Sequence, residues 1–237
     1  MLIVCALGRV DHNSEEYRST ANVPEPGWAR LADNSLVPVL SVIGNNSSSP
    51  FTRNEHASRT IADVVSNGGF ETGLAPWTTT PVGGLGFGCG QPWTRASTGS
   101  TCIAVANPPG GSFALYSSFD GAGPLNFVAS QVITIPIGLV NAVISFRYQA
   151  EWSFSGANRL FTIDANGTPL VTVLNLPSGS GNTGLLTFTQ VITAQLAAYS
   201  GSTITLGLHL FVPQSFTGPA GIVVDNVSLI LDFNGNE

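Results

Sequence analysis

From residue 65 onward, the chain consists of short stretches in which every second residue is apolar, and this alternation limits the possible folds more than any other feature. It is clearest where Ile204, Leu206, Leu208 and Leu210 alternate with other residues. Side chains of a β-strand point to opposite faces in turn, so the pattern predicts strands with one buried face. We expect strands at 112–117, 127–135, 142–150, 160–164, 170–174, 185–192, 203–211 and 221–233.

Turn-forming residues separate these stretches. Gly, Pro, Asn and Ser bound the predicted strands, and Asn166 followed by Gly167 is typical of a type I′ hairpin turn. The sole helical signal is one short turn at 194–199. About eight short strands without long helices predict an all-β fold, a two-sheet β-sandwich of the jelly-roll type.

Residues 1–64 differ from the rest of the chain. They hold five of the eight arginines and half of the fourteen acidic residues, with prolines at 24, 26, 38 and 50. Their apolar patches are short and isolated, which predicts an extended N-terminal arm that does not bury enough surface to fold alone. We therefore predict two parts, an arm at 1–64 that acts as an assembly segment and a jelly roll at 65–237.

One apolar stretch of the arm is a candidate assembly strand. It comprises Leu36, Val37, Val39, Leu40, Val42 and Ile43. Such a strand can be added to the sheet edge of a partner subunit, with Pro38 on the outer side because proline lacks an N–H. It can equally pack on its own domain, and both interpretations stay open.

Charge and motifs exclude several functions. The chain has no lysine, only 9% charged residues and a net charge of −6, which disfavours binding to nucleic acids and to anionic membranes. No apolar run reaches the roughly 20 residues of a membrane span. The apolar first seven residues lack the basic flank and cleavage site of a signal peptide.

No catalytic motif is present and the three histidines are far apart, with His209 in a predicted strand, so we expect a non-enzymatic protein.

Three cysteines leave at least one thiol unpaired. Cys89 and Cys102 can close a short disulfide loop in an oxidising compartment, which would leave Cys5 as an unpaired thiol. Three reduced thiols are the alternative, and the spacing does not decide between them.

Two motifs resemble one known domain family. Asn67-Gly68-Gly69-Phe70-Glu71 followed by Trp77 is similar to the opening of galactose-binding-like jelly rolls. Residues 223–229 resemble the last strand of those domains, and residues 131–136 and 143–148 match segments expected between them. Over 65–233 the chain therefore resembles carbohydrate-binding modules. The resemblance implies a jelly roll with neighbouring first and last strands, a non-catalytic role and glycan binding.

The resemblance also implies a structural calcium ion beside the first and last strands. Glu71 and Asp225 match its carboxylate ligands, and the backbone carbonyl of Asn67 is a third candidate. Carboxylates and carbonyls are the oxygens that Ca²⁺ prefers. The alternative is that both carboxylates cap turns by accepting hydrogen bonds from backbone amides.

A sugar site in such a fold needs aromatic rings and planar polar groups. The candidates are Trp93, in a loop rich in glycine and proline, and Arg147, Gln149, Glu151 and Trp152 of one predicted strand. In a regular strand, 147, 149 and 151 share one face and Trp152 lies on the other. The polar face is the candidate glycan surface, while an ordinary solvated face or a subunit contact are the alternatives.

Three functions agree with these features. The first is a virion surface protein of a bacteriophage, such as a capsid cement, decoration or fibre protein. Its arm would anchor it to neighbouring subunits in a homo-oligomer, and its jelly roll would face outward. The second is a secreted, extracellular carbohydrate-binding module, and the third is a filament subunit that donates residues 36–43 to the next subunit.

Overall fold

The chain divides into two compact units, Met1–Asn54 and Glu55–Glu237. A computed structural model describes residues 28–30, 36–38, 58–82, 91–97, 107–120, 124–153, 159–176, 179–212 and 219–235. In the first unit, β1 (Trp28–Arg30) and β2 (Leu36–Pro38) pair antiparallel, with Ala29 opposite Val37. The start of the candidate assembly strand is therefore paired within its own unit, and residues 39–43 lie outside the described part.

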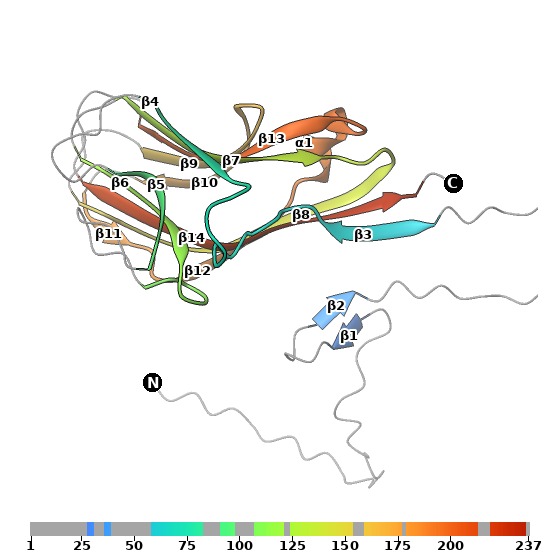
Figure 1. Cartoon of the computed structure of the whole chain (residues 1–237), viewed down its shortest axis with the longest axis horizontal. Helices are drawn as coiled ribbons and strands as arrows, with labels where there is room; N and C mark the ends of the chain where they lie inside the picture. Colours follow the sequence, from blue (N-terminus) through green and yellow to red (C-terminus); the bar gives the residue numbers. More distant parts are fainter. Residues whose placement is uncertain are drawn as a thin grey trace, which may run out of the picture. The chain divides into compact units, whose positions relative to one another are not determined.

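The second unit is a sandwich of two antiparallel sheets, as Figure 1 shows. The five-stranded sheet has the order β10-β9-β13-β7-β4. Its strands are β4 (Thr78–Val82), β7 (Leu125–Thr134), β9 (Arg159–Ala165), β10 (Thr168–Leu176) and β13 (Thr203–Val212).

The second sheet has seven strands and is built around the long pair β8 and β14. Its path is β11-β8-β14-β6-β5; in addition, β12 pairs with β8, and β3 pairs with the C-terminal half of β14. Its strands are β3 (Arg59–Asp63), β5 (Gln91–Ala96), β6 (Ala114–Phe119), β8 (Leu139–Trp152), β11 (Gly181–Asn182), β12 (Leu186–Val191) and β14 (Ala220–Asn234).

The core fills the space between the two sheets, and the predicted alternation builds it. Ile204, Leu206, Leu208 and Leu210 of β13 are all buried, as are alternate residues of β7 and β8. Aromatic rings from both sheets meet there, since Phe146 contacts a β9 ring edge-on, with ring centroids 5.9 Å apart. The two-sheet sandwich predicted from the sequence is confirmed.

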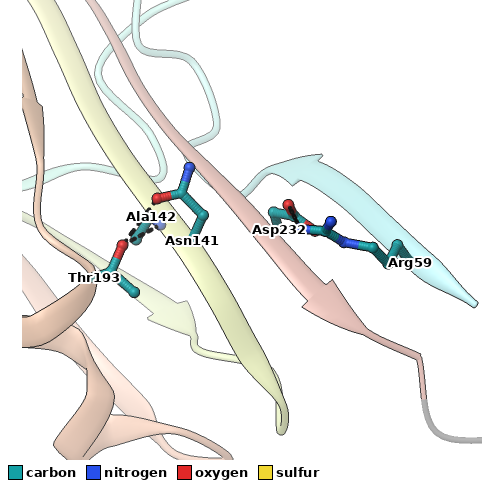
Figure 2. A network of polar contacts seen from close by, with 5 residues as sticks. All are labelled: Arg59, Asn141, Ala142, Thr193 and Asp232. Atoms are coloured by element: carbon teal, nitrogen blue, oxygen red, sulfur yellow. Dashed lines mark hydrogen bonds and ion pairs between the residues drawn. The ribbon is translucent and has the colours of Figure 1, made fainter. Parts of the chain in front are cut away.

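Local signals also agree with the structure. Asn166 and Gly167 have φ values of 52° and 79° and join β9 to β10, which confirms the predicted hairpin. The predicted helical turn is present as α1 (Thr193–Leu196) followed by the 3₁₀ helix η1 (Ala197–Tyr199). Figure 2 shows how Thr193 ties this turn to β8: its hydroxyl donates to Asn141 and accepts the Ala142 N–H.

The β domain starts earlier than the predicted boundary at residue 65. Strand β3 belongs to the seven-stranded sheet, and the compact unit begins at Glu55. Strands β4, β5 and β11 are further elements beyond the sequence prediction. In the described part of the chain, no helix is both long and apolar enough to cross a membrane.

Candidate functional site

Strand β8 presents one polar face to the outside of the seven-stranded sheet. Phe146, Tyr148 and Ala150 are buried between the sheets, while residues 147, 149 and 151 lie half-buried on the opposite side. The division of this strand into an apolar inner face and a polar outer face was predicted from the sequence and is confirmed. The outer face thus gathers Arg147, Gln149 and Glu151 on one surface.

The neighbouring strand β11 completes a hydrogen-bonded grid with these residues. Gln149 Nε2 donates to Asn182 Oδ1 at 3.2 Å, and Asn182 Nδ2 donates to Glu151 Oε2 at 3.0 Å. Asn182 is opposite Glu151 in the β8–β11 register, and its Oδ1 also accepts the Gly184 N–H at 2.7 Å. We call Gln149, Glu151 and Asn182 the amide grid. Asn182 was missed from the sequence because its two-residue strand lies in a stretch that resembles a loop.

On the other side of the amide grid, the face continues onto β14 and β6. Asp225 is opposite Arg147, Val223 is opposite Gln149, and Tyr116 is opposite Val223. The Arg147 guanidinium donates to the carbonyl of Pro109, so it also holds the loop before β6. Tyr116 is 1% exposed, so its ring offers no open surface for stacking.

Asp225 is a fully buried carboxylate on this face. Its pKa is raised to about 6, mainly by burial and to a lesser extent by the nearby Glu71 carboxylate, although two backbone hydrogen bonds and the charge of Arg147 act in the opposite direction. The hydrogen bonds come from the backbone N–H groups of Gly110 and Asn226, each at 2.7 Å. Burial, together with the charge of Asp225, also raises the pKa of Tyr116 to about 12. The two groups are therefore electrostatically coupled.

Trp93 does not belong to this surface, and its predicted place in a loop is wrong. It lies in β5 and is 2% exposed. Its ring is 6.0 Å from that of Phe161 in the core, and its Nε1 donates to the Phe127 carbonyl at 3.0 Å. The indole is thus packed between the sheets, with its one donor satisfied.

Trp152 also lies away from the polar face. It ends β8 and packs against the core, with its Nε1 buried and without a partner among the described residues. Gly181 of β11 lies opposite it, and a Cβ there would come 2.3 Å from the indole ring. The five predicted glycan residues are therefore divided: three share the outer face, and the two tryptophans are on the core side.

The opening and closing motifs of the family resemblance meet in space, as expected. The Val227 N–H donates to the Gly68 carbonyl at 3.0 Å, and a Cβ at Gly68 would lie 1.8 Å from the Val227 carbonyl oxygen. The opening motif forms turns here rather than a strand. Asn67 fixes these turns, because its Nδ2 donates to the carbonyls of Gly73 and Ala75, both at 2.9 Å.

Glu71 and Asp225 both accept backbone hydrogen bonds, as the capping interpretation predicts. Glu71 Oε1 accepts the N–H groups of Ser112 and Phe113 at 2.9 and 3.1 Å. Gly111 has φ +58°, and a Cβ there would lie 2.1 Å from Glu71 Oε1. The loop at 110–113 is therefore wrapped closely around the Glu71 carboxylate.

The calcium site stays a prediction, and the two carboxylates differ in the oxygens they have left: both Asp225 oxygens accept a backbone N–H. Among the described contacts of Glu71, both hydrogen bonds to its carboxylate use Oε1, which leaves Oε2 for a metal. Asp225 is close enough for the charge of Glu71 to raise its pKa, and a cation would offset that repulsion. The Asn67 carbonyl already accepts the Phe70 N–H at 3.2 Å, and the described residues contain no cluster of three His, Cys, Asp or Glu side chains.

A second polar cluster lies on β9 and β13 of the other sheet. His209 Nδ1 is 2.6 Å from Asp164 Oδ2, and Thr162 Oγ1 donates to Asp164 Oδ1 at 2.6 Å. Asp164 is 2% exposed, and both of its oxygens have partners. This arrangement indicates a structural role for His209 within the sheet. Cys5, Cys89 and Cys102 lie outside the described residues.

No protein-family model and no curated protein matches the chain. Similar solved structures include TmCBM61 in complex with β-1,4-galactotriose, at 16% identity and a TM-score of 0.43, covering 73% of this chain and 99% of that one. The family 11 carbohydrate-binding module of Clostridium thermocellum is 13% identical, with a TM-score of 0.35 and coverage of 73% and 94%. The enzymatically active domain of tailspike protein 4 of bacteriophage CBA120 is 17% identical, with a TM-score of 0.41 and coverage of 71% and 21%. Two of these three are carbohydrate-binding modules.

Proposed function

We propose that this protein is a non-catalytic glycan-binding β-sandwich, and that the outer face of β8 and β11 holds the sugar. The observation that carries the proposal is the amide grid, because Gln149, Glu151 and Asn182 place two amides and a carboxylate side by side on one sheet face. Sugar hydroxyls each need a donor and an acceptor, and planar amide and carboxylate groups supply both.

The geometry favours binding by hydrogen bonds rather than by stacking. Among the described contacts, Gln149 Oε1 and Glu151 Oε1 remain available beyond the grid. Tyr116, the aromatic residue on the same face, is buried. We therefore expect binding with a favourable enthalpy opposed by entropy, as is typical of interfaces dominated by hydrogen bonds.

Titration calorimetry of the full chain with soluble polysaccharides tests this proposal. The probes are β-1,4-galactan, mixed-linked β-1,3-1,4-glucan and xylan. For the polysaccharide that binds, Gln149→Ala should weaken the affinity about tenfold, which corresponds to the loss of one well-placed hydrogen bond. Asn182→Ala should have a similar effect, because the grid then loses its central member.

Gln190→Ala is the matched control. Gln190 is an exposed glutamine of β12 in the same sheet, but it is opposite Ile144, whose side chain lies in the core. This variant should keep the wild-type affinity. If no polysaccharide binds, or if both glutamine variants weaken binding equally, the outer face of β8 and β11 is not the sugar site.

We further propose that the N-terminal unit attaches the protein to neighbouring subunits on a virion surface, as in a capsid decoration or fibre protein. Two observations support it: Met1–Asn54 forms a compact unit separate from the β domain, and it is rich in arginine relative to that domain. A secreted carbohydrate-binding module and a filament subunit remain the alternatives. Limited digestion with trypsin tests this arrangement, because the arginines are concentrated in the N-terminal unit.

A further inference from the structure

Strand β3 carries side chains that are complementary to those of a second copy of itself. Arg59, Ile61 and Asp63 alternate with their neighbours and therefore lie on one face, with Ile61 opposite Asp232 in β14. The Ile61 side chain is 59% exposed, although isoleucine is among the residues most often buried. The strand thus presents an apolar centre flanked by one positive and one negative charge. Asp63 Oδ1 accepts the N–H groups of Val65 and Leu229 at 3.0 and 3.1 Å, so Oδ2 is the oxygen that can accept a donor from a second copy.

The backbone of β3 also has an open hydrogen-bonding edge. The Val64 N–H donates to Leu229 O at 3.0 Å, and the Gly235 N–H donates to Ser58 O at 2.6 Å. In an antiparallel pair the hydrogen-bonded positions alternate, so residues 58, 60, 62 and 64 face β14. The N–H and C=O groups of 59, 61 and 63 point away from it, and among the described strands β3 pairs with β14 alone. Figure 1 shows β3 at the border of the sheet.

We propose that β3 pairs antiparallel with β3 of a second copy of this chain, about a two-fold axis at Ile61. Ile61 then faces Ile61 of the second copy, and Arg59 of each copy faces Asp63 of the other. All three outward-facing residues of each strand form hydrogen-bonded pairs, so the two seven-stranded sheets join into one continuous sheet. Such a two-fold contact uses the same surface on both copies.

The charges select this register. A shift of the axis by one residue, to 60 or 62, places Ile61 opposite Arg59 or Asp63 and leaves two pairs instead of three. A parallel arrangement in the same register puts Arg59 against Arg59, and like charges directly opposite each other are destabilising. The antiparallel register centred on Ile61 therefore gives the largest number of favourable cross-strand pairs.

An ion pair between Arg59 and Asp232 within each copy orients Arg59 beside this edge. Arg59 Nε donates to Asp232 Oδ1 at 3.1 Å, and its Nη2 donates to Asp232 Oδ2. Figure 2 shows this side chain reaching from β3 to β14. A guanidinium carries five N–H donors, so Nη1 remains for a carboxylate on the other side. These two bonds hold the Arg59 guanidinium in place before the second copy arrives.

The test is the concentration dependence of the mass of the full chain, measured by light scattering after size exclusion from micromolar to millimolar concentration. Wild-type protein should form a dimer. Ile61→Lys places two ammonium groups opposite each other and should weaken the dimer at least about tenfold. Val191→Lys is the matched control, because Val191 is 58% exposed on the edge strand β12. It should leave the dimer unchanged.

Both variants change exposed residues, so their thermal midpoints should stay within about 2 °C of the wild type. Ile61→Pro gives a second, independent test. It removes an N–H that faces the free edge, and so should abolish the dimer without breaking the pairing with β14. A chain that stays monomeric at every concentration overturns the proposal, and so does a dimer that survives both Ile61 variants. Either result would leave glycan binding unaffected, because the amide grid lies on other strands.

Discussion

Asp225 is the residue where burial and charge oppose each other most directly. Its side chain is fully buried, yet it is opposite Arg147 in the β8–β14 register and accepts hydrogen bonds from two backbone N–H groups. The pKa of about 6 shows that burial outweighs these favourable contacts. The folded protein therefore holds a proton on Asp225 at pH values where an unfolded chain has released it.

This shift predicts a pH dependence of stability. Because the pKa of Asp225 rises from 3.8 to about 6 on folding, the folded state binds more protons in that range, and stability falls as the pH rises through it. A shift of two pKa units corresponds to about 3 kcal/mol. Urea unfolding of chelator-treated protein at pH 4 and pH 7 should show this loss in the wild type. The Asp225→Asn variant should lack this contribution to the loss of stability, because asparagine does not titrate. If the stability of the variant and of the wild type changes equally between pH 4 and pH 7, the prediction is wrong.

Residues of the candidate site differed in how far the sequence could place them. Arg147, Gln149 and Glu151 were placed on the outer face because strand alternation fixes the direction of each side chain. Trp93 was misplaced because its strand is surrounded by glycines and prolines that suggest a loop, although its indole fills the core. Asn182 depends on a pairing between distant segments, which alternation within one strand does not reveal.

At the scale of elements, the turn at 66–73 and the loop at 109–113 act together on the end motif of β14. The Glu71 carboxylate accepts backbone N–H groups of the loop, and the Gly68 carbonyl accepts the Val227 N–H. The Asp225 carboxylate accepts the Gly110 N–H. These contacts join three segments that are far apart in the sequence. A cation between Glu71 and Asp225 would strengthen the junction, and we propose calcium for this position.

Calcium should therefore raise the thermal midpoint of the protein. A ligand at one hundred times its dissociation constant adds about 2.7 kcal/mol, which for a domain of this size is a rise of roughly 5 °C or more relative to chelator. Glu71→Gln should remove this difference because it deletes one ligand charge. Glu151→Gln, a change on the outer face of β8, should keep it. Equal midpoints in calcium and in chelator would rule out the ion.

Strands with regular alternation were predictable, whereas short edge strands were not. The eight predicted strands correspond to β6 to β10 and β12 to β14, and most of them place an apolar face in the core. Strand β3 is exposed on most of its length, and β4 contains Pro81, so neither shows a periodic apolar pattern. Their pairing partners, rather than their own residues, make them strands.

At the scale of the whole molecule, the chain combines a β-sandwich with an N-terminal unit of different composition. Four arginines, at 9, 18, 30 and 53, lie in Met1–Asn54, and the other four lie in strands of the sandwich. Trypsin cuts after arginine here, since the chain lacks lysine. Cleavage by the protease therefore measures the accessibility of each unit separately. In our proposal the N-terminal unit binds neighbouring subunits and the sandwich binds the glycan.

Without its neighbouring subunits, the N-terminal unit should be removed by brief trypsin digestion, leaving a fragment that begins at Asn54. Arg59 should resist cleavage, because β3 is paired with β14 and the guanidinium is bound to Asp232. Arg95, Arg147 and Arg159 should resist as well, since each lies in a strand of the sandwich. Native mass spectrometry of the products measures both results. Rapid cleavage after Arg53 alone agrees with a segment that awaits partner subunits. Resistance of that bond in a monomer means that the unit packs without partners, which contradicts the virion attachment and favours the secreted binding module.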